Sequence, residues 1–254
     1  MIPIPRAPLD DRLAARLEEK SRGLRREDGE KARAAWRGAK AIRHDLKIVL
    51  GGMAFGFSRC MYCGDGQGTD IDHLMPLAHD ARHVFSWSNH FLACSHCNSN
   101  EKRDHYPVDE HGRCLLIDPC REDPYDHLAL TLATGRYAGR TAKGEATLRV
   151  FGLGRPVLEQ GRSRAYVRCK SMLRDWARQM SAGEEHEAAE VLRSLQVHPF
   201  GDVLYAIVRR VDAPGAAVVF GGEVVDALRH LRPVSARSPL TAESTAPAAP
   251  AGTS

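Results

Sequence analysis

The sequence predicts an α+β protein in which a small metal-stapled core lies between helical N- and C-terminal segments. The first observation is a pair of Cys-x-x-Cys motifs, Cys60/Cys63 and Cys94/Cys97, which enclose a short run typical of a β-strand. The second is that stretches rich in Ala, Leu, Lys, Arg and Glu flank these motifs. The parts we expect are a helical segment (1–55), the core (56–106), a mostly helical region (107–232) and a disordered tail (233–254).

Composition places the chain among ordinary globular proteins. Its 254 residues, 43% hydrophobic and 27% charged, are enough for one or two domains with a real core. The formal net charge of +4 is compatible with a polyanionic partner but does not demand one. No apolar run is long enough to cross a bilayer, and the first residues lack the apolar stretch of a secretory signal. We therefore expect a cytoplasmic protein.

The flanking elements follow from hydrophobic periodicity and from the glycines. The second N-terminal helix is expected to end at Gly51 and Gly52. The clearest amphipathic helix carries an apolar stripe through Tyr166, Leu173 and Trp176. The expected helices are 8–22, 29–50, 155–181, 184–196, 201–211 and 223–231, and a strand–turn–strand segment is expected at 129–140. The tail is predicted to be disordered because it consists largely of Pro, Ala, Ser and Thr.

The two cysteine pairs predict a zinc site. Seven cysteines are an odd number, and cytoplasmic thiols stay reduced, so a disulfide framework is disfavoured. Two Cys-x-x-Cys knuckles suit one tetrahedral Zn²⁺, to which Cys60, Cys63, Cys94 and Cys97 each give a thiolate. Four thiolates leave no open coordination position, so this ion is expected to be structural rather than catalytic.

Between the knuckles, the segment "TDIDHLMPLA" carries unusual polar chemistry. In an ideal strand Asp72 and His73 point to opposite faces, although a strand end or a bulge can turn both into one cleft. Asn98 directly follows the last cysteine of the second knuckle. A helix that begins there would place Lys102 on the same face as Asn98.

These residues, in this order and spacing, resemble the HNH nuclease family. The residues that carry the resemblance are Cys60, Cys63, Asp72, His73, Asn89, Cys94, Cys97 and Asn98. The resemblance implies a ββα-metal fold with the Asp-His pair on the first strand. It places Asn89 in the following loop and Asn98 at the start of the helix. We therefore expect an HNH core with a four-cysteine zinc knuckle between helical flanks.

The resemblance implies metal-dependent DNA cleavage that leaves 5′-phosphate and 3′-hydroxyl ends. His73 would act as general base, because an imidazole suits proton abstraction near neutral pH. Asp72 and Asn98 would hold a catalytic Mg²⁺ or Mn²⁺ through hard oxygen donors, and Asn89 would orient the site. Lys102 and Arg103 are candidates for holding a neighbouring phosphate. In many family members the Lys follows the third motif residue by three positions rather than four.

Other interpretations of the same residues stay open. A non-catalytic zinc ribbon that binds nucleic acid or a protein partner would need the cysteines alone, and an RNase could use the same core. Asn98 could merely cap a helix. His90 and His96 are nearby alternative ligands. Asp70 is expected either to be exposed or to contact a metal ligand without binding the metal itself.

The segment after the core is similar to the corresponding region of HNH proteins in bacterial anti-phage defence, such as Septu-type and retron-associated effectors. The similarity lies in the run "IDPCREDPYDHL", a glycine-containing hairpin and an arginine-rich helix. It implies an effector that works with a partner ATPase or sensor protein. The Asp-Pro pairs at Asp118-Pro119 and Asp123-Pro124 are expected to form turns rather than a metal site.

Overall fold

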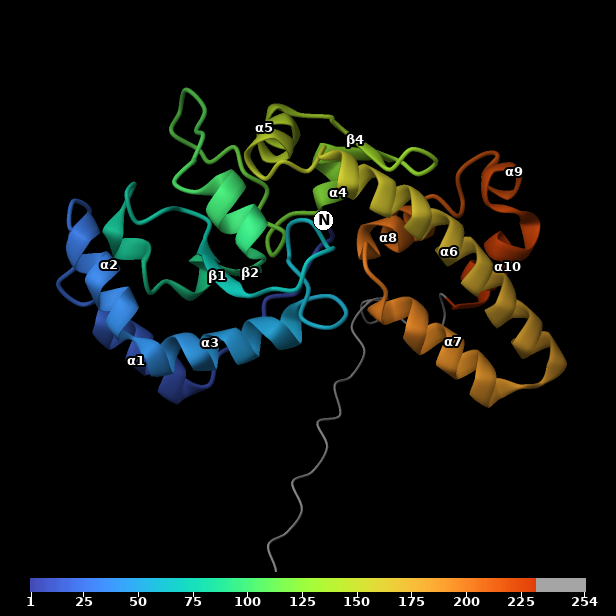
Figure 1. Cartoon of the computed structure of the whole chain (residues 1–254), viewed down its shortest axis with the longest axis horizontal. Coiled ribbons are helices and arrows are strands. Elements are labelled where there is room, and N and C mark those ends of the chain that lie inside the picture. The colour runs from blue at the N-terminus through green and yellow to red at the C-terminus, as the bar shows by residue number, and fades with distance from the viewer. Residues whose placement is uncertain (232–254) are drawn as a thin grey trace, which may run out of the picture.

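The computed structural model describes residues 1–231, so the predicted tail at 233–254 lies outside the described residues. Figure 1 shows two regions joined through the middle of the molecule. The first holds three N-terminal helices around a short hairpin, and the second is a group of C-terminal helices. A mixed helix and strand structure with a four-cysteine cluster and helical flanks is therefore present, which confirms the predicted fold class.

The N-terminal helices are α1 (Asp11–Ser21), α2 (Gly29–Gly38) and α3 (Lys40–Met53). The predicted single helix at 29–50 is thus two helices, because Ala39 leaves the helical conformation (φ −82°, ψ 48°) directly after Gly38. The helix after this break also runs through Gly51 and Gly52 and does not end before them. The three helices bury one apolar cluster, made by Leu13, Leu17, Ala32, Ile42, Leu46, Val84 and Phe85 among others.

Two short strands form the hairpin at the centre of this region. Strand β1 (Asp70–His73) pairs antiparallel with β2 (His90–Ala93), and the register sets Asp72 opposite Phe91 and His73 opposite His90. The connecting loop contains two single 3₁₀ turns, η1 (Ala81–His83) and η2 (Trp87–Asn89). After β2 the chain enters η3 (His96–Lys102), a short π-helix. The order strand, loop, strand, helix is that of the expected ββα unit.

The segment that follows the core is held together by its own polar groups. The short helix α4 (Pro124–His127) is capped by Asp123, whose side chain accepts from the Tyr125 amide, and the Cys120 amide donates to Asp118. Asp118-Pro119 therefore forms a turn, as expected, whereas Asp123-Pro124 begins a short helix. Strands β3 (Leu128–Thr131) and β4 (Arg136–Gly139) form the second hairpin, in the predicted strand–turn–strand segment.

The C-terminal helices pack around the long helix α6 (Pro156–Ala182). They comprise α7 (Glu185–Val197), α8 (Gly201–Arg209), α9 (Ala216–Phe220) and α10 (Gly222–Leu231). Helix α5 (Ala142–Val150) was not predicted, because Gly144 interrupts a weak apolar pattern; it begins at the Thr141 cap. Within residues 1–231, every helix is too short or too polar to span a membrane.

Candidate active site of the zinc-stapled core

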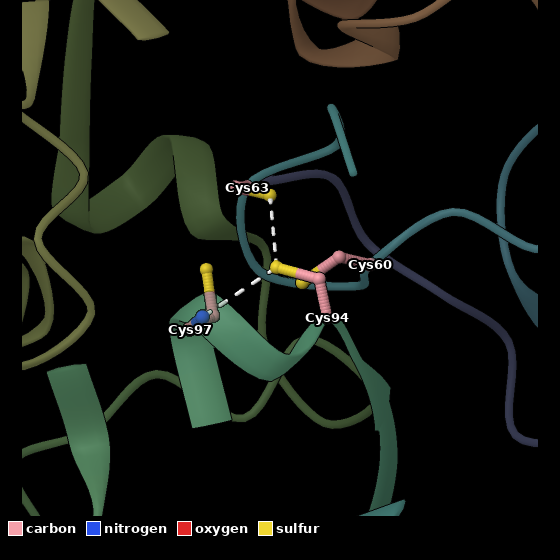
Figure 2. Close-up of side chains that lie close together, drawn as sticks. All are labelled: Cys60, Cys63, Cys94 and Cys97. Carbon is pink, nitrogen blue, oxygen red and sulfur yellow. Dashed lines mark hydrogen bonds between the residues drawn. The ribbon is translucent and has the colours of Figure 1, made fainter. Parts of the chain in front are cut away.

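The four predicted cysteines meet at one point of the structure. Their sulfur atoms all lie within 4.8 Å of one another, and the thiols of Cys63 and Cys94 are 3.9 Å apart (Figure 2). Tetrahedral Zn²⁺ at about 2.3 Å from each sulfur requires sulfur–sulfur distances of about 3.8 Å. The cluster therefore fits the predicted structural zinc ion. In the described part of the chain, it is the one cluster of three or more Cys, His, Asp or Glu side chains close enough to share a metal.

Backbone hydrogen bonds fold each cysteine pair into a tight knuckle. The Gly64 amide donates to the Cys60 carbonyl at 2.9 Å, and the Cys97 amide donates to the Cys94 sulfur at 3.5 Å. Hydrogen bonds from the neighbouring thiols, that of Cys60 first, lower the pKa of Cys94. This sulfur is consequently predisposed to the thiolate form that zinc binds.

Each knuckle also presents one side chain to the carboxylates of β1. Tyr62 lies inside the first knuckle, and its hydroxyl donates to Asp72 Oδ2 at 2.5 Å. Asn98 directly follows the second knuckle, and its side-chain nitrogen Nδ2 donates to Asp70 Oδ2 at 3.2 Å. Residues 70 and 72 share one face of the strand because side chains alternate. The two cysteine knuckles therefore set two polar groups against two carboxylates in the layer between hairpin and helix.

Lys102 completes this layer from the end of η3. It is fully buried, and its ammonium donates to Asp72 Oδ1 at 3.0 Å and to the His73 carbonyl at 2.7 Å. We expected Lys102 to hold a substrate phosphate, but its ammonium forms a buried ion pair with Asp72 and is not available to a ligand. Arg103, the next residue, is exposed and is the one of the pair that can reach a ligand.

His73 lies on the other face of the hairpin. Strand β1 has no bulge, so His73 points away from the Asp72 side, towards α2. Its Nε2 is 3.0 Å from the Val84 carbonyl, and its ring meets Trp36 edge to face at 4.6 Å. A carbonyl oxygen can only accept, so Nε2 carries the proton and Nδ1 keeps the lone pair of the neutral ring.

Burial lowers the pKa of His73 to about 4, and the charges of Lys102 and Arg43 act in the same direction. The hydrogen bond to Val84 opposes this shift without cancelling it. The imidazole is therefore neutral at physiological pH, which is the state that a general base requires.

A second histidine, which sequence reasoning considered only as an alternative ligand, supports the first. His90 is fully buried opposite His73, and its Nε2 lies 2.8 Å from the same Val84 carbonyl. Its ring stacks on Trp36 with centroids 5.1 Å apart. His90 thus helps to fix the loop carbonyl and the tryptophan that orient His73. His96, the other alternative, lies half-exposed beside Glu101 at 3.0 Å.

Asn89 holds the long loop of the hairpin. Its side-chain oxygen accepts from the Met75 amide at 2.7 Å, and its side-chain nitrogen donates to the Met75 and His83 carbonyls. Its own carbonyl accepts from the Leu74 amide at 2.9 Å. These four bonds tie the chain directly after His73 to the loop that carries Val84.

A hollow of about 580 Å³ opens beside this arrangement, between α3 and the edge of the hairpin. Asp70, Ile71 and Asn98 line one side of it, and Trp36 contributes from α2. Among the predicted site residues, the structure therefore brings Asn98 to the hollow and buries Asp72. Asp70, which we expected to be exposed or to support the ligands, is the carboxylate in direct contact with Asn98.

Comparison with known proteins agrees with this geometry. The model of the HNH endonuclease family matches residues 60–104, from the first cysteine to the end of η3. The chain contains an HNH endonuclease domain. The chain is also distantly homologous to the Septu protein PtuB of Bacillus mycoides (strain KBAB4), with 28% identity over 95 residues. That match covers 32% of this chain and 32% of the PtuB chain.

The HNH match begins at Cys60, after the end of α3, so it leaves Trp36 and all of α3 outside. Sequence reasoning missed Trp36 and Tyr62 as parts of the site. Tyr62 could have been found from its place inside the first knuckle. Trp36 gave no local signal, because its contacts with His73 and His90 span more than 35 positions of the chain.

We expect Cys97→Ser to lose the zinc ion and unfold the HNH domain, because one of four ligands to a structural metal is removed. Structural zinc contributes roughly 10–16 kcal/mol to the folding of small zinc domains. Cys114→Ser is the matched control, since Cys114 is half-buried and lies outside the cluster. Zinc content by atomic emission and thermal unfolding would test this. Full zinc content in a folded Cys97→Ser protein would contradict it.

We expect Lys102→Met to destabilise the protein by about 3–5 kcal/mol, because the buried Asp72 carboxylate loses its cation. The double variant Lys102→Met/Asp72→Asn should recover much of this loss, since it also removes the unpaired charge. Urea unfolding followed by tryptophan fluorescence measures both. The exposed neighbour provides a control, and Arg103→Met should change stability by no more than about 0.5 kcal/mol. Equal effects at 102 and 103 would rule out the buried ion pair.

Proposed function

We propose that this HNH domain is a divalent-metal-dependent endonuclease that hydrolyses phosphodiester bonds in DNA and leaves 5′-phosphate and 3′-hydroxyl ends. The observation that carries the proposal is the orientation of His73. Its Nε2–H is held by the Val84 carbonyl, which leaves the Nδ1 lone pair of a neutral imidazole to act as the base. The match to the HNH endonuclease family supports the same assignment.

In the proposed reaction, Nδ1 of His73 takes a proton from water while the water oxygen forms a bond to phosphorus. The bond between phosphorus and the 3′ oxygen breaks, and that oxygen leaves with the bonding electrons and takes a proton from solvent water, while the imidazolium of His73 returns its proton to solvent. Asn89 holds the loop so that the Val84 carbonyl keeps the imidazole in the required tautomer. Removing such a base costs typically 10²–10⁴-fold in rate.

The donor set beside the hollow fits the divalent ion that the family implies. Asn98 and Asp70 are in contact and both offer hard oxygen atoms, which Mg²⁺ and Mn²⁺ prefer. Asp72, the carboxylate that we predicted as a ligand, shares its layer but faces the Lys102 ammonium. Asp72 can therefore join the site only if Lys102 withdraws from it. When bound, the metal would stabilise negative charge on the phosphate and on the leaving oxygen.

The biological setting that we propose is bacterial anti-phage defence. The similarity to the Septu protein PtuB supports it, although the match covers 32% of each chain. In that setting a partner ATPase or sensor protein would direct the nuclease. A neighbouring ATPase gene, and co-purification of its product with this chain, would test the partnership separately from cleavage.

We expect His73→Ala to reduce plasmid nicking at least 100-fold in the presence of Mg²⁺ or Mn²⁺, because the general base is lost. His79→Ala is the control, since His79 is an exposed histidine of the same loop. Supercoiled DNA and a single-stranded RNA should be run in parallel. Cleavage of RNA alone would replace the proposed DNase by an RNase, and undiminished nicking by His73→Ala would remove His73 from the mechanism.

Removing loosely bound divalent metal should abolish nicking without unfolding the domain. The two kinds of site differ, because four thiolates enclose the zinc while the proposed catalytic ion has two protein oxygen donors and open positions. We expect EDTA to stop cleavage, and Mg²⁺ or Mn²⁺ to restore it, while one zinc per chain remains. Asp70→Asn should raise the Mn²⁺ concentration needed for half-maximal rate. Cleavage that continues in EDTA would contradict the second metal.

A further inference from the structure

We propose that the exposed face of α3 is the surface that binds the phosphate backbone of the DNA substrate. This inference rests on the proposed nuclease function and adds a substrate-binding element from outside the matched HNH segment. The face consists of Lys40, Arg43, His44 and Lys47, and is called here the α3 basic face.

The pattern of α3 fixes which way these side chains point. Positions 40, 43, 44 and 47 follow one another at three- and four-residue steps, so they share a side of the helix. Ile42, Leu46 and Leu50 form a separate buried stripe beside this side, in the cores of the protein. With a rise of 1.5 Å per residue, the face extends over roughly 10 Å. That length corresponds to about three phosphates of one strand, measured along the DNA axis.

The charges of the α3 basic face are free to bind a polyanion. The only acidic residue in α3 is Asp45, and its carboxylate already pairs with Arg16 of α1 at 2.6 Å. Among residues 1–231, no ion pair within 4.0 Å engages Lys40, Arg43 or Lys47. An ordinary solvated helix face commonly alternates positive and negative charges. The α3 basic face carries only positively charged groups and a histidine.

The position of the face links it to the proposed chemistry. All four of its side chains line the hollow that Asn98 and Asp70 line from the other side. The Arg43 guanidinium lies 5.7 Å from the centre of the Trp36 ring, which in turn contacts His73. A phosphate held by α3 would therefore rest next to the proposed metal donors, Asp70 and Asn98.

Asp70 determines on which side of the hollow a phosphate can bind. Its carboxylate repels phosphate, whereas the opposite wall of the hollow, formed by α3, attracts it. The phosphate backbone of the DNA is consequently expected to lie along α3. The divalent ion would then lie between that backbone and the pair formed by Asp70 and Asn98. Contacts of this kind supply affinity and position without reading the base sequence.

The test measures how binding depends on salt, separately from cleavage. The triple variant Lys40→Ala/Arg43→Ala/Lys47→Ala is made in the His73→Ala background, so that the DNA stays intact. Binding of a fluorescent 30-base-pair duplex is followed by anisotropy from 50 to 200 mM salt. Each lost phosphate contact should reduce the slope of log K against log salt by about 0.9, so the triple variant should lose about 2–3.

The matched control neutralises three exposed cations of the first helix and its end, in Arg12→Ala/Lys20→Ala/Arg22→Ala. The control should keep the slope of its parent, and circular dichroism should show that both triple variants are folded. An unchanged slope in the folded α3 variant would overturn the proposal, as would an equal loss in the control. A change confined to an RNA duplex would overturn DNA as the ligand.

Cleavage by the protein with an intact His73, measured alongside, separates this inference from the nuclease function. Cleavage together with an unchanged slope in the α3 variant would reject the α3 basic face and leave the nuclease standing. A reduced slope with a protein that never cleaves would reject the nuclease and support α3 as a DNA-binding surface.

Discussion

The four-cysteine cluster is the constraint on which the rest of the site depends. Hairpin and π-helix are short, with four-residue strands and a seven-residue helix, and could not hold a fixed geometry alone. The zinc ion that fits the cluster would join the chain before β1 to the chain after β2. Because Tyr62 and Asn98 stand inside and next to the knuckles, the same staple sets the groups that contact the β1 carboxylates.

Strand alternation then divides the chemistry between two layers. Asp70 and Asp72 face the π-helix, whereas His73 faces α2, because β1 runs without a bulge. The proposed base therefore lies beneath Trp36, a residue that the HNH match does not include. Trp36 orders both imidazoles, and α3 forms the wall of the adjoining hollow. The N-terminal helices are thus part of the site and not merely its support.

The sequence predicted what depends on local spacing and missed what depends on contacts across the chain. Cysteine spacing predicted the four-sulfur cluster, and periodicity predicted most flanking helices. The split of the helix at Ala39 was not predicted, because the apolar spacing continues across Gly38 and outweighed that glycine as a sign of a helix end. The pairing of Lys102 with Asp72 needs the register of η3 on the hairpin, which no local rule gives. The direct contact of Asp70 with Asn98 was not predicted for the same reason.

The π-helix explains how Lys102 reaches Asp72 although it follows Asn98 by four residues rather than the three common in the HNH family. The Arg103 amide donates to the Asn98 carbonyl, five residues back, so the turn accommodates one extra residue. Asn98 can then meet Asp70 while Lys102 meets Asp72, two positions along the same strand face. A buried ion pair of this kind contributes little net stability, but breaking it is costly. Its consequence here is a fixed register between helix and hairpin, which keeps Asn98 at the hollow.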